Sequence, residues 1–248
     1  MHNTFNTPSA ESRAHKGKSV QKLAQLGKFE ADKWTKIIPK NCLIDRDSTI
    51  VHECRGKSVL HVGACDAPFE FDKGKAGNLL HQKVRAVARR TLGVDVDASA
   101  IAALRAFGVD DILMVDITND SDSLSGETFD VVLCCDVIEH VRSPSPLLQA
   151  CRRHMSSDGV LIVTTINATA LKPALRALVG KEAVHNDHVA YYSFSTLGKL
   201  LTMEELNPSK FGVFSYPTVN PVVGWATQRI MKSAAATADG ILFYARRS

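Results

Sequence analysis

Short apolar stretches alternate with amphipathic ones from about residue 50 to the end of the chain. The apolar stretches predict five strands: Ser58–Val62, Thr91–Val94, Asp111–Met114, Val131–Cys134 and Gly159–Thr165. Apolar residues at helical spacing predict helices between these strands, near Leu79–Arg90, Ser99–Ala106 and Ser145–His154. Strands that alternate with helices are typical of βαβ units, so we expect an α/β, Rossmann-like, open and mostly parallel sheet with helices on both faces.

The C-terminal third predicts two helices and the last two strands of a seven-stranded sheet. The helices are expected at Ala168–Val179 and Ser195–Met203. The strands Phe211–Tyr216 and Gly240–Ala245 are expected to pair antiparallel at one edge of the sheet, with a crossover connection over Pro217–Ala236 between them.

The N-terminal segment differs from the rest in charge and pattern. Residues 1–18 are polar, whereas Val20–Ile38 has apolar residues at helical spacing, which predicts a helix there. Residues 1–40 hold eight Lys or Arg and three Asp or Glu. We therefore divide the chain into a basic tail with a helix (1–50) and a main domain (51–248). Without interleaved aromatic residues or a nucleic-acid motif, this arm predicts no nucleic-acid partner.

Composition and cysteine spacing predict a soluble, cytoplasmic protein. The 248 residues include six cysteines with no CxxC pair, so we expect buried, reduced thiols and no metal held by cysteine. The longest apolar runs have the length of a strand, and the polar start of the chain lacks the apolar stretch of a secretory signal, so we expect no membrane span.

The first two strands predict a nucleotide-binding edge. Strand Ser58–Val62 runs into Gly63, which permits close approach of a ligand, and the next strand ends on Asp95, whose carboxylate can accept hydrogen bonds from ribose hydroxyls. A dinucleotide site would place glycines where this chain has Cys65 and Pro68, and its acid would follow about 20 residues on. The acid here follows 32 residues on (95 − 63), with a loop-like insert at 69–77. This favours a nucleoside without pyrophosphate over a nicotinamide dinucleotide.

The same positions resemble the class I S-adenosylmethionine-dependent methyltransferases over residues 55–248. The segment Phe129–Val141 is the strongest single match, whereas the turn Gly63-Ala64-Cys65 departs from the family's usual glycines. The resemblance implies that S-adenosylmethionine is the cofactor, that Asp95 binds its ribose, that Val96 covers the adenine and that Asp116 bonds the adenine amino group. The cofactor-binding residues it implies are Gly63, Ala64, Cys65, Asp95, Val96, Asp116, Ile117, Cys135 and Asp136.

A narrower resemblance concerns the acceptor. Leu79-Leu80-His81 and Gly180–Ser195 resemble a bacterial and archaeal methyltransferase subgroup associated with surface-glycan biosynthesis. This implies O-methylation of a small molecule or a glycan precursor. Two alternatives remain open. One is a nicotinamide-dependent oxidoreductase on a similar sheet. The other is a noncatalytic cofactor-binding scaffold, which the irregular turn after Gly63 would suit.

Four histidines are candidates for a general base that deprotonates an acceptor hydroxyl: His81, His140, His185 and His188. We expect His188 to be this base, or else to order a lid, and we take His140 as the second catalytic candidate. Asp136, Glu139 and His140 would share one face if a helix began there. They resemble a segment that can serve a metal in ubiquinone-pathway O-methyltransferases, but we expect a structural helix start and no metal.

Overall fold

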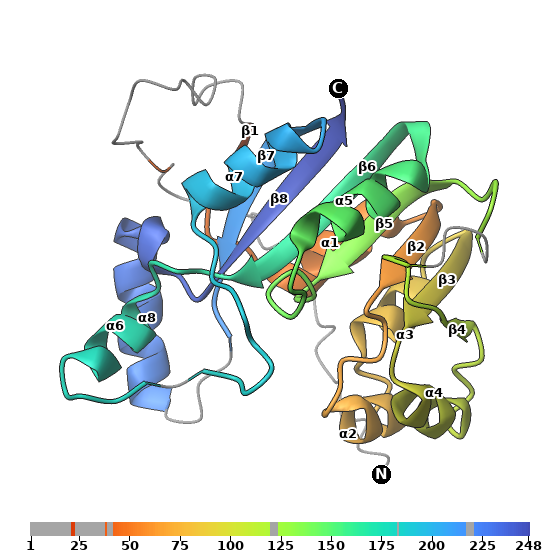
Figure 1. Cartoon of the computed structure of the whole chain (residues 1–248). Coiled ribbons are helices and arrows are strands. Elements are labelled where there is room, and N and C mark those ends of the chain that lie inside the picture. Colours follow the sequence, from red (N-terminus) through yellow and green to blue (C-terminus); the bar gives the residue numbers. More distant parts are fainter. Residues whose placement is uncertain (1–20, 23–37, 39–41, 120–123, 183, 217–220) are drawn as a thin grey trace, which may run out of the picture.

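The computed structural model describes residues 21–22, 38, 42–119, 124–182, 184–216 and 221–248, which form one mixed sheet flanked by helices (Figure 1). The strand order is β1-β7-β8-β6-β5-β2-β3-β4. The strands are β1 (Gln21–Lys22), β2 (Ser58–Val62), β3 (Arg90–Asp95), β4 (Ile112–Met114), β5 (Phe129–Cys135), β6 (Met155–Ile166), β7 (Leu206–Phe214) and β8 (Gly240–Arg247). The α-helices are α1 (Arg46–Cys54), α2 (Glu70–Lys75), α3 (Leu80–Arg85), α4 (Ala98–Arg105), α5 (Pro144–Arg153), α6 (Leu171–Ala177), α7 (Phe194–Met203) and α8 (Pro221–Ser233).

The strand pairing confirms the predicted sheet. Strands β2 to β6 pair with one another in parallel, whereas β8 lies antiparallel to both β6 and β7. The order reverses at β2, which pairs with β3 on one side and β5 on the other, so a ligand crevice is expected at the carboxyl ends of these strands. The structure adds the two-residue strand β1 to the seven that the sequence predicts.

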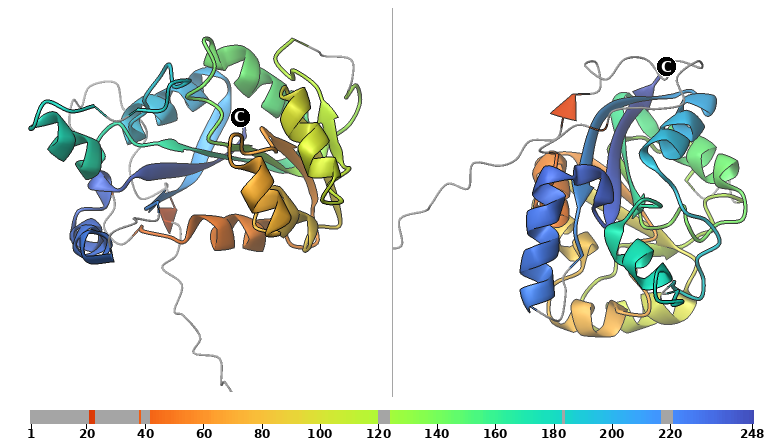
Figure 2. Two further views of the ribbon diagram at one scale, coloured as in Figure 1. Left: turned by 90° about the horizontal axis from the view of Figure 1, so that it is seen from below. Right: turned by 90° about the vertical axis from the view of Figure 1, so that its left-hand side faces the viewer.

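Helices cover both faces of the sheet, as Figure 2 shows. Alternate strand residues face opposite sides, so Leu60, Val132 and Val163 lie in one core cluster with α5 and α7. Val59, Leu133 and Ile162 lie in the other, with α1 and α3. The helix predictions are confirmed in this central part of the fold.

Several predicted elements need correction. Gln21 and Lys22 are not helical, because their backbone pairs with the exposed edge of β7 at Phe211 and Lys210. Apart from Ile38, the other positions of the helix predicted over 20–38 lie outside the described residues. Most of the basic tail lies outside them too. The insert at 69–77 contains helix α2 and is not a plain loop.

Two further helices depart from the prediction. Helix α3 stops at Arg85, because the next residues bond to the start of β2: the Val87 carbonyl accepts from Gly56 N–H, and the Lys57 carbonyl accepts from Arg89 N–H. Helix α1, which the sequence did not predict, crosses the expected boundary at residue 50, and its first turn is capped by Asp45. The division of the chain into a tail and a domain remains a prediction.

Two expectations about composition can be compared with the described residues. All six cysteines are free and buried, as predicted. None of the helices seen in the structure combines the length and the apolar character needed to cross a membrane.

Candidate functional site

The turn after β2 is tied to the end of β3 by three successive backbone N–H groups. Those of Gly63 and Ala64 donate to the Val94 carbonyl at 2.9 and 3.3 Å, and that of Cys65 donates to a carboxylate oxygen of Asp95 at 2.9 Å. Phosphate-binding turns use such N–H groups to hold the ligand. These three are already satisfied within the protein, so this turn is unsuited to a pyrophosphate.

Asp95 is half-buried and held at both carboxylate oxygens. Its second oxygen accepts from the N–H of Asp97 at 3.1 Å, and Asp97 in turn caps helix α4. Each carboxylate oxygen has two lone pairs, so Asp95 keeps acceptor capacity toward a ribose while its orientation is fixed. Val96 beside it is 68% exposed, which leaves an apolar surface against which an adenine ring can pack.

Gly63 adopts a left-handed backbone, with φ of +70°, and is approached closely by the segment that follows β5. A Cβ at Gly63 would stand 2.3 Å from Cγ2 of Val137. Val137 therefore fills the space on the Cβ side of this glycine. The contact joins the carboxyl ends of β2 and β5 at the point where the strand order reverses.

Asp116 lies after β4 in a turn that uses its carboxylate. It accepts hydrogen bonds from the N–H and hydroxyl of Thr118 at 3.0 and 2.6 Å and from the Asn119 amide at 2.6 Å. The hydrogen bond from the Thr118 hydroxyl is the main cause that lowers the pKa of Asp116, although burial opposes it. The carboxylate is thus charged, and the hydrogen bonds within the turn fix its orientation.

Four other predicted cofactor residues could contact a cofactor only through their backbone atoms. Ala64, Cys65, Ile117 and Cys135 are all buried in the core, so only their N–H or carbonyl groups could reach a cofactor. Burial raises the pKa of the Cys135 thiol to about 12, which keeps it protonated. That result favours the structural role expected for these cysteines over a redox role.

Asp136 directly follows β5 in a left-handed conformation, with φ of +56°, and forms an ion pair that the sequence analysis missed. Its carboxylate accepts from the Arg46 guanidinium at 2.9 Å and from the Thr164 hydroxyl at 2.8 Å. Arg46 lies on α1, 90 residues earlier, so no local pattern in the sequence connects the two. The pair joins α1 to the carboxyl ends of β5 and β6.

The expected helix start at Asp136 is wrong. Helix α5 begins at Pro144, and residues 138–140 form a turn, in part because Asp136 adopts the left-handed conformation that a helix does not permit. Asp136 is paired with Arg46, Glu139 is fully buried and His140 is exposed, so the three side chains do not share a face. Burial raises the pKa of Glu139 to about 7, and the nearby Asp136 adds to the shift.

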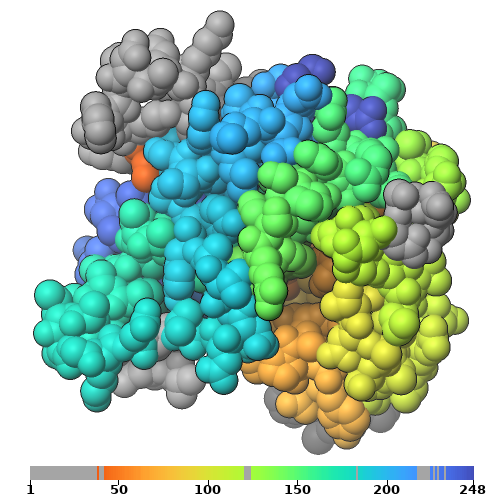
Figure 3. Space-filling view, in the orientation of Figure 1, coloured from red at the N-terminus to blue at the C-terminus, as the bar shows by residue number. Residues whose placement is uncertain are grey.

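The chain between α6 and α7 meets this turn. The N–H groups of Val189 and Ala190 both donate to the Glu139 carbonyl, at 2.9 and 3.3 Å, and Figure 3 shows the segment (cyan) against the green segment after β5. This contact brings His188 to His140, with ring centroids 4.6 Å apart. Burial, then the neighbouring His140 and His185, lowers the pKa of His188, so its ring is neutral at pH 7.

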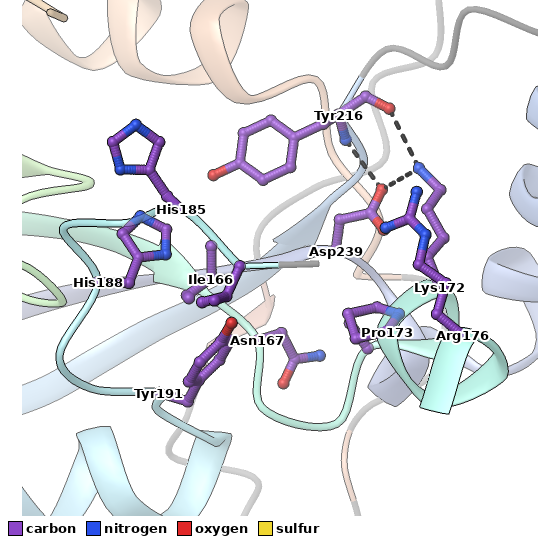
Figure 4. Close-up of a pocket in the computed structure, with 12 residues that line it drawn as sticks. Ile166, Asn167, Lys172, Pro173, Arg176, His185, His188, Tyr191, Tyr216 and Asp239 are labelled. Carbon is purple, nitrogen blue, oxygen red and sulfur yellow. Dashed lines mark hydrogen bonds and ion pairs between the residues drawn. The ribbon is translucent and has the colours of Figure 1, made fainter. Parts of the chain in front are cut away.

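A cavity of about 240 Å³ opens beside these histidines (Figure 4). The phenol of Tyr216 points toward the side on which His185 and His188 lie. On the other side, Lys172 forms an ion pair with the buried Asp239 at 2.7 Å, and Asp239 also accepts from the Tyr216 N–H at 3.0 Å. The cavity therefore combines the rings of Tyr191 and Tyr216 with the imidazoles of His185 and His188, a combination suited to a small polar acceptor.

The structure separates the four histidines that were candidates for a base. His140, His185 and His188 lie together, and the last two line the cavity, but His81 is fully buried and contacts His61, with Nδ1 atoms 3.3 Å apart. His61 is itself a buried core residue. Sequence reasoning did not find Tyr216, Lys172 or Asp239, which no motif connects.

The strand order, the acid at the end of β3 and the closing antiparallel strand are those of the class I S-adenosylmethionine-dependent methyltransferases. Residues 55–207, more than half of the chain, match the family described as "Methyltransferase domain", and the chain belongs to that family.

Relatives and solved structures agree with this assignment. A ubiquinone biosynthesis O-methyltransferase of Glaesserella parasuis is 28% identical over 46% of this chain and 51% of its own length. The enzyme of that name from Cereibacter sphaeroides is 32% identical over 47% and 50%. The chain thus spans about half the length of the curated relatives it matches.

Two solved structures share the fold at low sequence identity. A SAM-dependent methyltransferase from Archaeoglobus fulgidus has a TM-score of 0.57 and 17% identity, covering 82% of this chain and 91% of its own. The N-methyltransferase NodS from Bradyrhizobium japonicum, solved with S-adenosylhomocysteine, has a TM-score of 0.52 and 16% identity, covering 82% and 85%.

Proposed function

We propose that this protein transfers the methyl group of S-adenosylmethionine to a hydroxyl oxygen of a small acceptor. The observation that carries the proposal is the unit formed by the turn after β2 and Asp95. Its N–H groups are already bonded, while its carboxylate is oriented and retains acceptor capacity. Such an edge suits the ribose of a nucleoside better than the pyrophosphate of a dinucleotide, which argues against the nicotinamide alternative.

The fold suggests how the two substrates meet. The cofactor edge lies at the ends of β2 and β3, and the cavity borders the ends of β6 and β8, with β5 between them. The turn that carries Asp136 and His140 follows β5, so it stands between cofactor and acceptor. Methyl transfer is an in-line displacement, in which positioning contributes much of the rate.

His188 is the proposed general base, with His140 as the second candidate. The acceptor oxygen attacks the methyl carbon, the bond from that carbon to sulfur breaks, and S-adenosylhomocysteine leaves. The hydroxyl proton passes to the neutral ring of His188, whose lowered pKa keeps a lone pair available at pH 7. His188 also lines the cavity, as a base must.

The size of the cavity fits a small-molecule acceptor. It has a volume of about 240 Å³ and adjoins a second cavity of about 360 Å³ that shares Ala170, Pro173 and Tyr191 with it, and ligand pockets usually have roughly 300–1,000 Å³. A glycan precursor agrees with the sequence resemblance in Gly180–Ser195, the segment that supplies His185 and His188. A phenol is the second candidate, because the curated relatives are named for ubiquinone biosynthesis.

The test is transfer of labelled methyl from S-adenosylmethionine to two panels, one of sugar nucleotides and free sugars and one of hydroxyphenols. Labelled product and release of S-adenosylhomocysteine with a member of either panel support O-methylation and name the acceptor class. Stoichiometric cofactor binding with no transfer to any member, or to amine analogues only, contradicts it. Cofactor binding without any transfer is the result that a noncatalytic scaffold would give.

A further inference from the structure

Three imidazoles from two separate segments gather at the edge of the cavity. One ring nitrogen each from His140, His185 and His188 lies within 4.8 Å of the other two. Ring centroids are 4.6 to 5.8 Å apart. We propose that these three histidines form a binding site for a divalent transition-metal cation of the Zn²⁺ type.

The donor set fits such a cation. Imidazole nitrogen is a preferred ligand of Zn²⁺, Ni²⁺ and Cu²⁺, and three histidines with a fourth position left open is a known arrangement of zinc sites. Zn–N bonds of about 2.1 Å place tetrahedral ligand atoms about 3.4 Å apart, so the ring nitrogens must close by up to about 1.4 Å. His140 and His185 are exposed, so their rings can rotate to do so.

One feature of the surroundings supports a cation here. Nδ1 of His188 is buried and has no hydrogen-bond partner within the described part of the chain, so one nitrogen at the site lacks a partner that a ligand would provide. Nδ1 of His185 accepts a hydrogen bond of 3.3 Å from the backbone N–H of Asp187, which anchors this ring to its own loop.

The backbone holds the two segments together. Val189 and Ala190 donate to the Glu139 carbonyl, so the residues next to two of the three ligands are bonded to each other. This site is different from the acid-x-x-acid-histidine arrangement considered from the sequence. Asp136 is bonded to Arg46 and Thr164, and Glu139 is fully buried. Neither carboxylate is therefore placed to bind a cation together with His140.

A bound cation would use the lone pair that a base at His188 needs. We therefore expect the loaded protein to be inhibited in any methyl transfer that uses this base. That consequence depends on the proposed function, whereas cation binding itself does not.

The experiment is a titration of the full chain, purified without a histidine tag and stripped with a chelator, with Zn²⁺ by equilibrium dialysis and with Co²⁺ by visible absorption. We expect one cation per chain and, for Co²⁺, the strong visible bands of a tetrahedral site. His185→Ala should weaken binding at least about tenfold. His52→Ala, at an exposed histidine on α1, should not change it.

Binding that is absent, or equal in the parent, His140→Ala and His185→Ala proteins, would overturn the proposal. Thermal unfolding of each variant shows that it is folded, and S-adenosylmethionine titration of the same samples separates the two proposals. A protein that binds the cofactor but no cation refutes only the metal site, and one that binds the cation but no cofactor refutes only the proposed function.

Discussion

Asp95, at the end of β3, accepts a hydrogen bond of 2.9 Å from the backbone N–H of Cys65, 30 residues earlier in the chain. This bond fixes the carboxylate against the turn after β2, because the two parallel strands end side by side. The relationship joins the fold to the proposed chemistry, since the same carboxylate is expected to bind the ribose of the cofactor. Its removal should therefore weaken cofactor binding and also leave the Cys65 N–H without its acceptor.

Asp95→Ala should weaken S-adenosylmethionine binding by roughly 10–100-fold, because hydrogen bonds to a charged group are worth about 1.5–3 kcal/mol. Calorimetric titration measures the change. Asp110→Ala is the matched control, since Asp110 is an exposed aspartate whose partner is the surface residue Arg85. Equal affinities in the parent and Asp95→Ala proteins would show that the cofactor lies elsewhere.

Gly63→Ala should destabilise the fold through a steric clash as well as through its backbone. A Cβ there meets Val137 at 2.3 Å, whereas at Gly56, which has nearly the same φ of +69°, it meets nothing within 4 Å. Overpacking typically costs about 1–3 kcal/mol, so Gly63→Ala should cost about that much more than Gly56→Ala in urea unfolding. Adding Val137→Ala should recover part of the loss, and equal costs for the two glycine variants would refute the contact.

The strand pattern and the acid at the end of β3 were enough to predict the sheet and its nucleotide-binding edge, because both are local in sequence. The Arg46–Asp136 pair was beyond such reasoning, since its partners are 90 residues apart. The turn at 138–140 was mistaken for a helix start because spacing alone does not reveal the left-handed conformation of Asp136. Likewise, the meeting of His140 with His185 and His188 depends on hydrogen bonds from the following residues to the Glu139 carbonyl.

Asp130→Asn should lower stability in a pH-dependent way. The carboxylate of Asp130 accepts from the N–H and hydroxyl of Ser58 at 2.8 and 2.9 Å, and the backbone hydrogen bond is the main cause that lowers its pKa. The stabilisation is present in full above the unfolded pKa of about 4 and is lost as the pH falls through the lower folded value.

The difference between the parent and Asp130→Asn proteins should thus be about 1 kcal/mol at pH 7 and should shrink progressively as the pH falls below about 4. Urea unfolding across this range measures it. Asp158→Asn, at an exposed aspartate, is the control and should show no such trend. A difference that stays constant with pH would mean that the charge of Asp130 does not contribute.

His188→Ala should abolish most methyl transfer while cofactor affinity is kept, because the side chain lines the acceptor cavity rather than the edge that holds the nucleoside. Loss of a general base typically lowers kcat by about 10²–10⁴-fold. The assay uses whichever acceptor the two panels identify, under metal-free conditions, with His52→Ala as the control. Normal turnover would exclude His188 as the base, and His140→Ala is then the next variant to test.

The central claim is that the edge formed by β2 and β3 binds an adenosyl cofactor and not a dinucleotide. Parallel calorimetric titrations with S-adenosylmethionine, S-adenosylhomocysteine and NAD test this most directly. We predict that both adenosyl compounds bind with one site per chain and that NAD does not. Binding of NAD alone, or of none of the three, would contradict the claim.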